Sequence, residues 1–145
     1  MTQPTTQAVA SHTIAVEHIG ISSELSFAEV RRRLEATLPN LDARVAGVLR
    51  SGDWKRAKDY QENRPKLTMF ERRDHGALLQ VFGLTRNALQ YEIGNPLTDS
   101  KMTRYQLAAA LYAPLRAVLF EDEQGRGILE FDMPSSFFIQ NEMSA

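Results

Sequence analysis

Two apolar runs near the end of the chain constrain its fold more than any other feature. Residues 115–121 and 127–132 are rich in branched and aromatic side chains, and a turn containing Gly125 separates them. Two such runs around a glycine-containing turn predict a β-hairpin. Residues 87–94 alternate, with Leu89, Tyr91 and Ile93 on one face and Ala88, Gln90 and Glu92 on the other, which predicts a strand with one buried face. The sequence therefore predicts three strands in this part of the chain.

Two further strands are predicted in the first half of the chain. Residues 12–22 alternate between branched apolar and polar residues, with a slip at Glu17 and His18, and residues 66–73 also have the composition of a strand. Residues 77–83 (ALLQVFG) are too evenly apolar for the period to decide their structure. A short buried helix and a strand both fit this run.

The segment from Ser26 to Pro39 has the period of a helix. Ser26 and Glu29 have the spacing of a capping box, in which each side chain satisfies a backbone amide at the helix start. Pro39 disfavours helical geometry at the preceding residue, so the helix should stop or kink there. The buried stripe is expected to contain Phe27, Val30, Leu34 and Leu38.

A helical insertion is predicted at about residues 41–65, where the apolar stripe resumes after the proline. Asp53 is suited to cap a second short helix within it, and we expect Trp54 and Ala57 to face inward. A later helix is expected to begin near Pro96.

Composition and charge exclude several classes of function. At 145 residues, the chain is long enough for one domain with a sizeable core. Its 17 basic and 18 acidic residues are interleaved, which argues against nucleic-acid binding, since that requires a concentrated excess of Lys and Arg. The chain has no cysteine, so disulfides, thiolate nucleophiles and cysteine-based metal sites are excluded.

The start of the chain carries no targeting signal of the secretory type. Residues 1–11 are small and polar, and no run approaches the ~20 apolar residues that a membrane span needs. We therefore expect a mobile leader at 1–11, a single domain at 12–145, a cytoplasmic location and no membrane contact.

Asp74 and His75 form the first candidate site. A carboxylate beside a histidine can orient the ring or raise its pKa, which is what a general base requires. Adjacent strand residues point to opposite faces, so the two side chains could converge only at a strand end or turn. In the structural alternative, Asp74 accepts backbone amides and His75 donates to a buried carbonyl.

Gly94, Asn95 and Pro96 form the second candidate site, between a predicted strand and a predicted helix. This sequence is typical of a turn or cap, although such a junction can also present free amides to an anion. Lys101, Arg104 and Arg116 are candidate anion contacts. The three histidines lack the spacing of metal ligands, and we expect neither a metal nor another cofactor.

The motifs DHGALLQVFG, YEIGNP and LYAPLRAVLFEDEQGRGILEFDMPSSF together resemble the bacterial domain-of-unknown-function family 302. The matched features are the Asp-His pair, the Gly-Asn-Pro junction, the Pro-Leu-Arg entry to the hairpin and Pro134 after it. The similarity covers about residues 12–138. It implies an α+β fold in which helices pack on one face of an antiparallel sheet, similar to the TATA-binding-protein arrangement, and commonly a homodimer. It implies no particular reaction.

Small-molecule binding is the leading hypothesis for function. Phe82, Leu89 and Tyr91 would line an apolar pocket for an anionic or amphipathic metabolite, with a polar contact from His75. The expected ligand-binding residues are Gly94, Asn95, Tyr91, Lys101 and Arg116.

Two alternatives remain open. In a metal-independent enzyme, His75 would shuttle a proton, Asp74 would orient it, and Asn95 or Arg116 would stabilise negative charge. In a homodimeric interaction module, an exposed sheet edge or the insertion carrying Trp54 would supply the contact. The binding and enzyme hypotheses both require His75 and Asn95 to border one solvent-accessible hollow.

Overall fold

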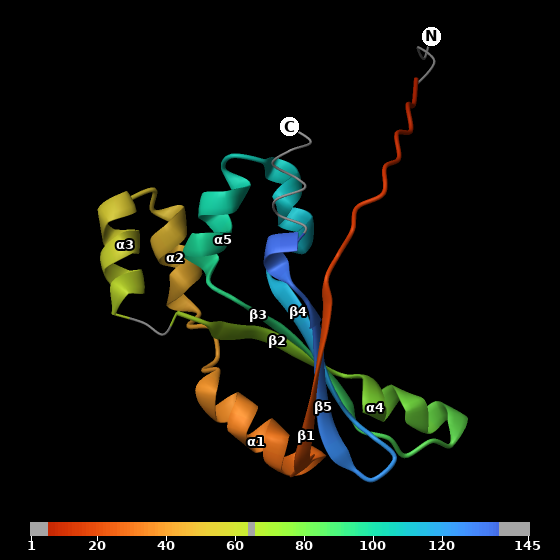
Figure 1. The fold of residues 1–145 in the computed structure, drawn as a ribbon. Helices are drawn as coiled ribbons and strands as arrows, with labels where there is room; N and C mark the ends of the chain where they lie inside the picture. The colour runs from red at the N-terminus through yellow and green to blue at the C-terminus, as the bar shows by residue number, and fades with distance from the viewer. Residues whose placement is uncertain (1–5, 64–65, 137–145) are drawn as a thin grey trace.

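A five-stranded antiparallel sheet forms the centre of the protein in a computed structural model that describes residues 6–63 and 66–136 (Figure 1). The strand order is β1-β5-β4-β3-β2, so β1 and β2 are the two edges. The predicted hairpin and the strand predicted at 87–94 are confirmed, whereas the strand predicted at 12–22 begins only at His18. The strands are β1 (His18–Ser26), β2 (Thr68–Asp74), β3 (Ala88–Gly94), β4 (Leu115–Glu121) and β5 (Arg126–Asp132).

The helices confirm the α+β class and the helical insertion. α1 lies against the sheet, while α2, α3 and α5 gather at one end of the strands and α4 lies at the other (Figure 1). No helix in the described part of the chain combines the length and apolar character needed to cross a membrane. The helices are α1 (Phe27–Thr37), α2 (Arg44–Arg50), α3 (Trp54–Glu62), α4 (His75–Leu78) and α5 (Pro96–Thr103), with 3₁₀ helices η1 (Leu79–Phe82) and η2 (Leu107–Tyr112).

Local sequence explains the bounds of α1. The Ser26 hydroxyl accepts a hydrogen bond from the Glu29 amide at 3.2 Å, as the capping signature predicts. The Glu29 carboxylate itself accepts hydrogen bonds from Arg32 and Arg33 on the next turn. The helix ends at Thr37, just before Pro39.

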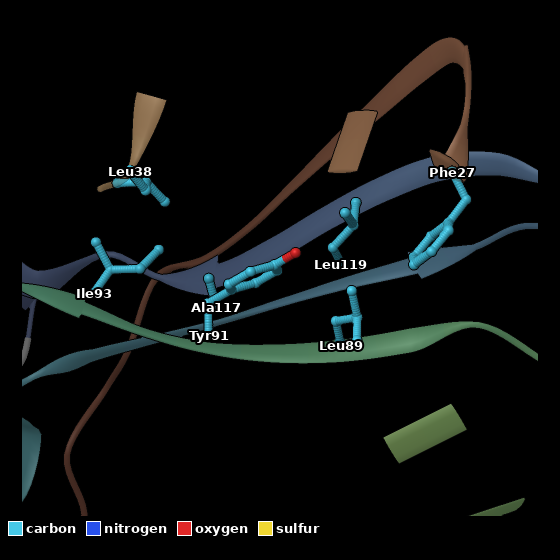
Figure 2. Close-up of a cluster of buried hydrophobic side chains, with 7 residues drawn as sticks. All are labelled: Phe27, Leu38, Leu89, Tyr91, Ile93, Ala117 and Leu119. Carbon is cyan, nitrogen blue, oxygen red and sulfur yellow. The ribbon is translucent and has the colours of Figure 1, made fainter. Parts of the chain in front are cut away.

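The core lies between α1 and one face of the sheet (Figure 2). The period-two alternation of β3 places every second side chain on this face, and Tyr91 is fully buried there. α1 approaches β5 very closely, because a Cβ atom built on Gly127 would lie 2.7 Å from a methyl carbon of Val30. The seven buried members of the cluster are Phe27, Leu38, Leu89, Tyr91, Ile93, Ala117 and Leu119.

Two predictions of burial are wrong. Trp54 is 50% exposed, although Ala57 beside it on α3 is buried as expected. The run at 77–83 is helical, but Val81 and Phe82 are 81% and 76% exposed. An even apolar run fixes neither its structure nor its burial, because no periodicity marks an inward face.

Candidate functional site

Asp74 caps a helix and does not pair with His75. Asp74 is the last residue of β2, and its carboxylate accepts a hydrogen bond from the Ala77 amide at 2.9 Å. His75 is the exposed first residue of α4, and its side chain makes no hydrogen bond with any residue that the structure describes. The geometry required for a His75–Asp74 acid–base pair is therefore absent.

Asn95 also caps a helix, and both polar atoms of its side chain are hydrogen-bonded inside the protein. Its amide oxygen accepts hydrogen bonds from the amides of Leu97 and Thr98 at 3.0 and 3.1 Å. Its amide nitrogen donates to the Lys66 carbonyl at 3.0 Å. Gly94 before it is buried, and a Cβ atom built there would lie 3.1 Å from the Asp99 carboxylate. Both residues therefore serve the junction between β3 and α5.

These two junctions lie at opposite ends of the sheet. β2 and β3 are antiparallel, with Asp74 opposite Leu89 and Thr68 opposite Gly94. The strand between these pairs spans about 20 Å at the usual rise per residue. Figure 1 shows α4 and α5 at the two ends of the strands. The expectation that His75 and Asn95 border one hollow is wrong.

The other predicted ligand contacts are also dispersed. The Arg116 side chain is exposed beside a hollow of about 110 Å³ that Asp132 also lines. The Lys101 amino group lies 5.6 Å from the centre of the Trp54 ring. The pocket expected from Phe82, Leu89 and Tyr91 does not form, because Phe82 is exposed while the other two pack in the core.

A cleft of about 540 Å³ opens between the end of α1 and the edge strand β2. The chain after α1 pairs with β2 here, since the Met69 amide donates to the Pro39 carbonyl at 2.8 Å and the Leu41 amide donates to Met69 at 2.9 Å. The cleft therefore has apolar and charged walls on two elements that pack against the core. Its lining includes Glu35, Leu38, Pro39, Asn40, Met69 and Arg72.

A charged cluster forms one wall of this cleft. Oε1 of Glu35 accepts hydrogen bonds from Arg72 at 2.6 Å, from the Tyr91 hydroxyl at 3.0 Å and from Arg31 at 3.3 Å. Burial favours a higher pKa for Glu35, but the hydrogen bonds from Arg72 and Tyr91 outweigh it and lower the pKa. The hydrogen bond to Glu35 raises the pKa of Arg72, while burial raises the pKa of the Tyr91 phenol. Glu35 and Arg72 are thus a stable ion pair at the cleft.

The histidine that does contact carboxylates is His18, which no sequence motif marks. His18 on β1 contacts Glu130 at 2.6 Å through Nε2 and Asp132 at 2.7 Å through Nδ1, both on the neighbouring β5. The hydrogen bonds to Glu130 and Asp132 raise the pKa of His18. Only the pairing of β1 with β5 brings these residues together, so no local motif could have revealed the cluster. Within the residues described, no group of three or more side chains has the arrangement of a metal site.

Comparisons with known proteins place the chain in a family. A model described as "Domain of unknown function DUF302" matches residues 58–145. The chain belongs to the DUF302 family. Its fold is similar to the crystal structure of an uncharacterized conserved DUF302 protein from Bacillus stearothermophilus, with a TM-score of 0.57 and 15% sequence identity. That similarity covers 88% of this chain and 80% of the other, so the shared fold extends to residues before 58. A search of curated proteins finds no match.

Proposed function

We propose that this DUF302 protein binds a small amphipathic molecule in the cleft between α1 and β2. The observation that carries the proposal is the Arg72–Glu35 pair at the wall of a cleft that Leu38 and Met69 also line. Ligand sites combine apolar walls with a few fixed polar groups, and 540 Å³ lies in the range of such pockets.

Glu35 and Arg72 both keep hydrogen-bonding atoms that a ligand could contact. All three donors to Glu35 converge on Oε1, so that Oε2 can accept a further hydrogen bond. Arg72 uses only Nη1 for Glu35, and its side chain is 39% exposed. A guanidinium has five N–H donors and binds carboxylates well, so we expect an anionic group of the ligand to contact Arg72.

Thermal-shift measurements with a panel of aliphatic and aromatic carboxylic acids test the proposal. We expect at least one to raise the Tm of the wild-type protein and to lose that effect in Arg72→Met. Arg73→Met is the matched control, because Arg73 is the next residue of β2 and points to the opposite face, where it contacts Glu92. The proposal fails if no acid raises the Tm, or if Arg72→Met responds as the wild type does.

Location is part of the same proposal. The absence of cysteine is compatible with a reducing compartment, and we expect the protein to act in the cytoplasm. Fractionation of cells that express the full chain with a C-terminal tag would check this, and recovery in a secreted or membrane fraction would contradict it.

A further inference from the structure

Arg116 lies on the face of the sheet opposite to α1. Ala117 on β4 and Phe131 on β5 are paired and face the core, so the residues next to them, Arg116 and Asp132, point to the other face. The register places Arg116 between Glu92 on β3 and Asp132 on β5. Side chains in such positions have Cβ atoms about 4.5–5.5 Å apart, close enough for an ion pair. Among the residues that the structure describes, however, none makes a hydrogen bond or ion pair with the Arg116 side chain.

The carboxylates on either side of Arg116 are already hydrogen-bonded to other basic side chains. Arg73 donates a hydrogen bond to Glu92 at 2.7 Å. Nδ1 of His18 lies 2.7 Å from Oδ1 of Asp132. The second carboxylate oxygen of Asp132, Oδ2, has no donor within the part of the chain that the structure describes. A guanidinium without a partner and a carboxylate oxygen without a donor therefore lie on neighbouring strands of this face.

Arg116 and Asp132 both line a small hollow of about 110 Å³. The rest of its wall is largely apolar and comes from the segment before β1 and from the chain that leads into β4. These wall residues are Val16, Tyr112, Pro114 and Leu115. The hollow is smaller than the ~300–1,000 Å³ of pockets for drug-sized ligands, so it suits a molecule with few atoms. It thus offers one cationic group, one anionic group and a short apolar wall.

We propose that this hollow binds the zwitterion of a small apolar α-amino acid such as L-valine. The guanidinium of Arg116 binds the ligand carboxylate, whose two oxygens match its fork of N–H donors. Oδ2 of Asp132 accepts a hydrogen bond from the ligand ammonium group, and the apolar side chain of the ligand lies against Pro114 and Leu115. A simple anion would bring its charge close to Asp132 without compensation, and a simple cation would leave Arg116 without a partner. The proposal is independent of ligand binding in the cleft between α1 and β2, which lies on the core-facing side of the sheet.

NMR titration of the isotope-labelled full chain tests the class of ligand. We expect L-valine to cause saturable shifts of the backbone amide signals of residues 115–117 and 131–133. Isovalerate is valine without its amino group, and isobutylamine is valine without its carboxylate. Each should bind about tenfold more weakly than L-valine, because each loses one charge-assisted contact. Binding of isovalerate or isobutylamine as tight as that of L-valine, or no saturable shift at these residues, would overturn the proposal.

Variants of the two charged residues assign the contacts in the same titration. Arg116→Gln should abolish L-valine binding, and Asp132→Asn should weaken it until L-valine binds no better than isovalerate. Arg50→Gln in α2 is the matched control, because Arg50 is also exposed and has no side-chain partner among the described residues. Arg72→Met removes the arginine of the cleft and should likewise leave L-valine binding unchanged.

The dispersion of amide signals reports whether each variant is folded. Arg116→Gln decides the outcome even where Asp132→Asn disturbs β1, since Arg116 has no described partner to lose. Unchanged binding in Arg116→Gln would contradict this site. Loss of binding in Arg72→Met would place the amino acid in the cleft between α1 and β2, which would also overturn the proposal.

Discussion

The β2–α4 and β3–α5 junctions are both closed by a helix-capping side chain, but the two caps differ greatly in burial. Asp74 and Asn95 each follow a strand and accept backbone amides at the start of the next helix. Asp74 makes one such hydrogen bond at an exposed end of the sheet, whereas Asn95 makes three hydrogen bonds and is 9% exposed. A capping side chain therefore matters most where its loss would leave buried polar groups without a hydrogen-bond partner.

The Asn95 junction also contains a half-buried acid, whereas the acid of the Asp74 junction is exposed. Burial raises the pKa of Asp99, in the first turn of α5, to about 6. Its carboxylate lies against Gly94, where a side chain would crowd it. The deeper junction therefore combines a necessary cap with a carboxylate that burial makes unfavourable when charged.

Replacing the deeper cap should have the largest effect. Asn95→Ala leaves the amides of Leu97 and Thr98 and the carbonyl of Lys66 without their partner, and we expect a loss of about 3 kcal/mol in the free energy of unfolding. Urea denaturation followed by circular dichroism measures it. Asn95→Asp keeps the two accepted bonds and should lose less. A cost of Asn95→Ala no greater than that of Asp74→Ala would refute the contrast.

At the Asp74 junction, the close contact between Gly76 and the backbone of Arg86 should contribute more to stability than the cap does. A Cβ atom at Gly76 would overlap the carbonyl oxygen of Arg86, which belongs to the main chain and cannot move aside as a side chain can. We expect Gly76→Ala to destabilise the protein by about 2 kcal/mol. Gly47→Ala in α2 is the control, because its Cβ would meet nothing within 4 Å, and it should stabilise by about 0.5–1 kcal/mol. Similar effects of the two substitutions would show that α4 does not pack against residues 86–88 as described.

The acid at the deeper junction should make stability depend on pH. The pKa of Asp99 is about 6 in the folded protein against a usual 3.8, so between these values the folded state holds a proton that the unfolded chain releases. The contribution of Asp99 to the free energy of unfolding therefore falls as pH rises from about 4 to 6 and stays lower above that. Asp99→Asn should flatten this dependence and stabilise the protein by about 1 kcal/mol at pH 7, after the loss of a favourable charge at the helix start. Denaturation at a series of pH values measures both, and an unchanged slope would count against a buried Asp99.

Substitutions of the exposed residues Asp74 and His75 should have the smallest effects on stability. Asp74→Ala removes a single cap and should cost about 0.5–1 kcal/mol. His75→Ala should change the free energy of unfolding by less than about 0.5 kcal/mol, because His75 contacts little. The ratio of these two costs, from parallel denaturant melts, separates a capping aspartate from a coupled Asp–His pair. Equal losses would restore the idea that the two side chains act together.

Much of the fold could be predicted because its signals are local. The alternation of 88–94 identifies Leu89, Tyr91 and Ile93 as core residues, and Ser26 and Asp53 cap helices as expected. Each of these signals depends on neighbours a few positions away, and such interactions survive whatever the rest of the chain does.

The candidate site could not be predicted in the same way. His18 and Asp132 are 114 positions apart, and only the placement of β1 beside β5 joins them. Arg72 and Glu35 likewise meet because α1 crosses the face of the sheet near β2. The adjacent Asp74 and His75 attracted attention because they are neighbours in sequence, whereas the start of α4 at His75 directs Asp74 to a backbone amide.

Gly127 influences the cleft beside β2 although it does not line it. α1 rests on the backbone of β5 at this point, and the later part of α1 and its C-cap supply Glu35 and Leu38 to the cleft. A methyl group added at Gly127 would push the start of α1 away from β5 and so tilt the whole helix. We therefore expect substitution of Gly127 to alter the width of the opening beside β2 without changing any group that lines it.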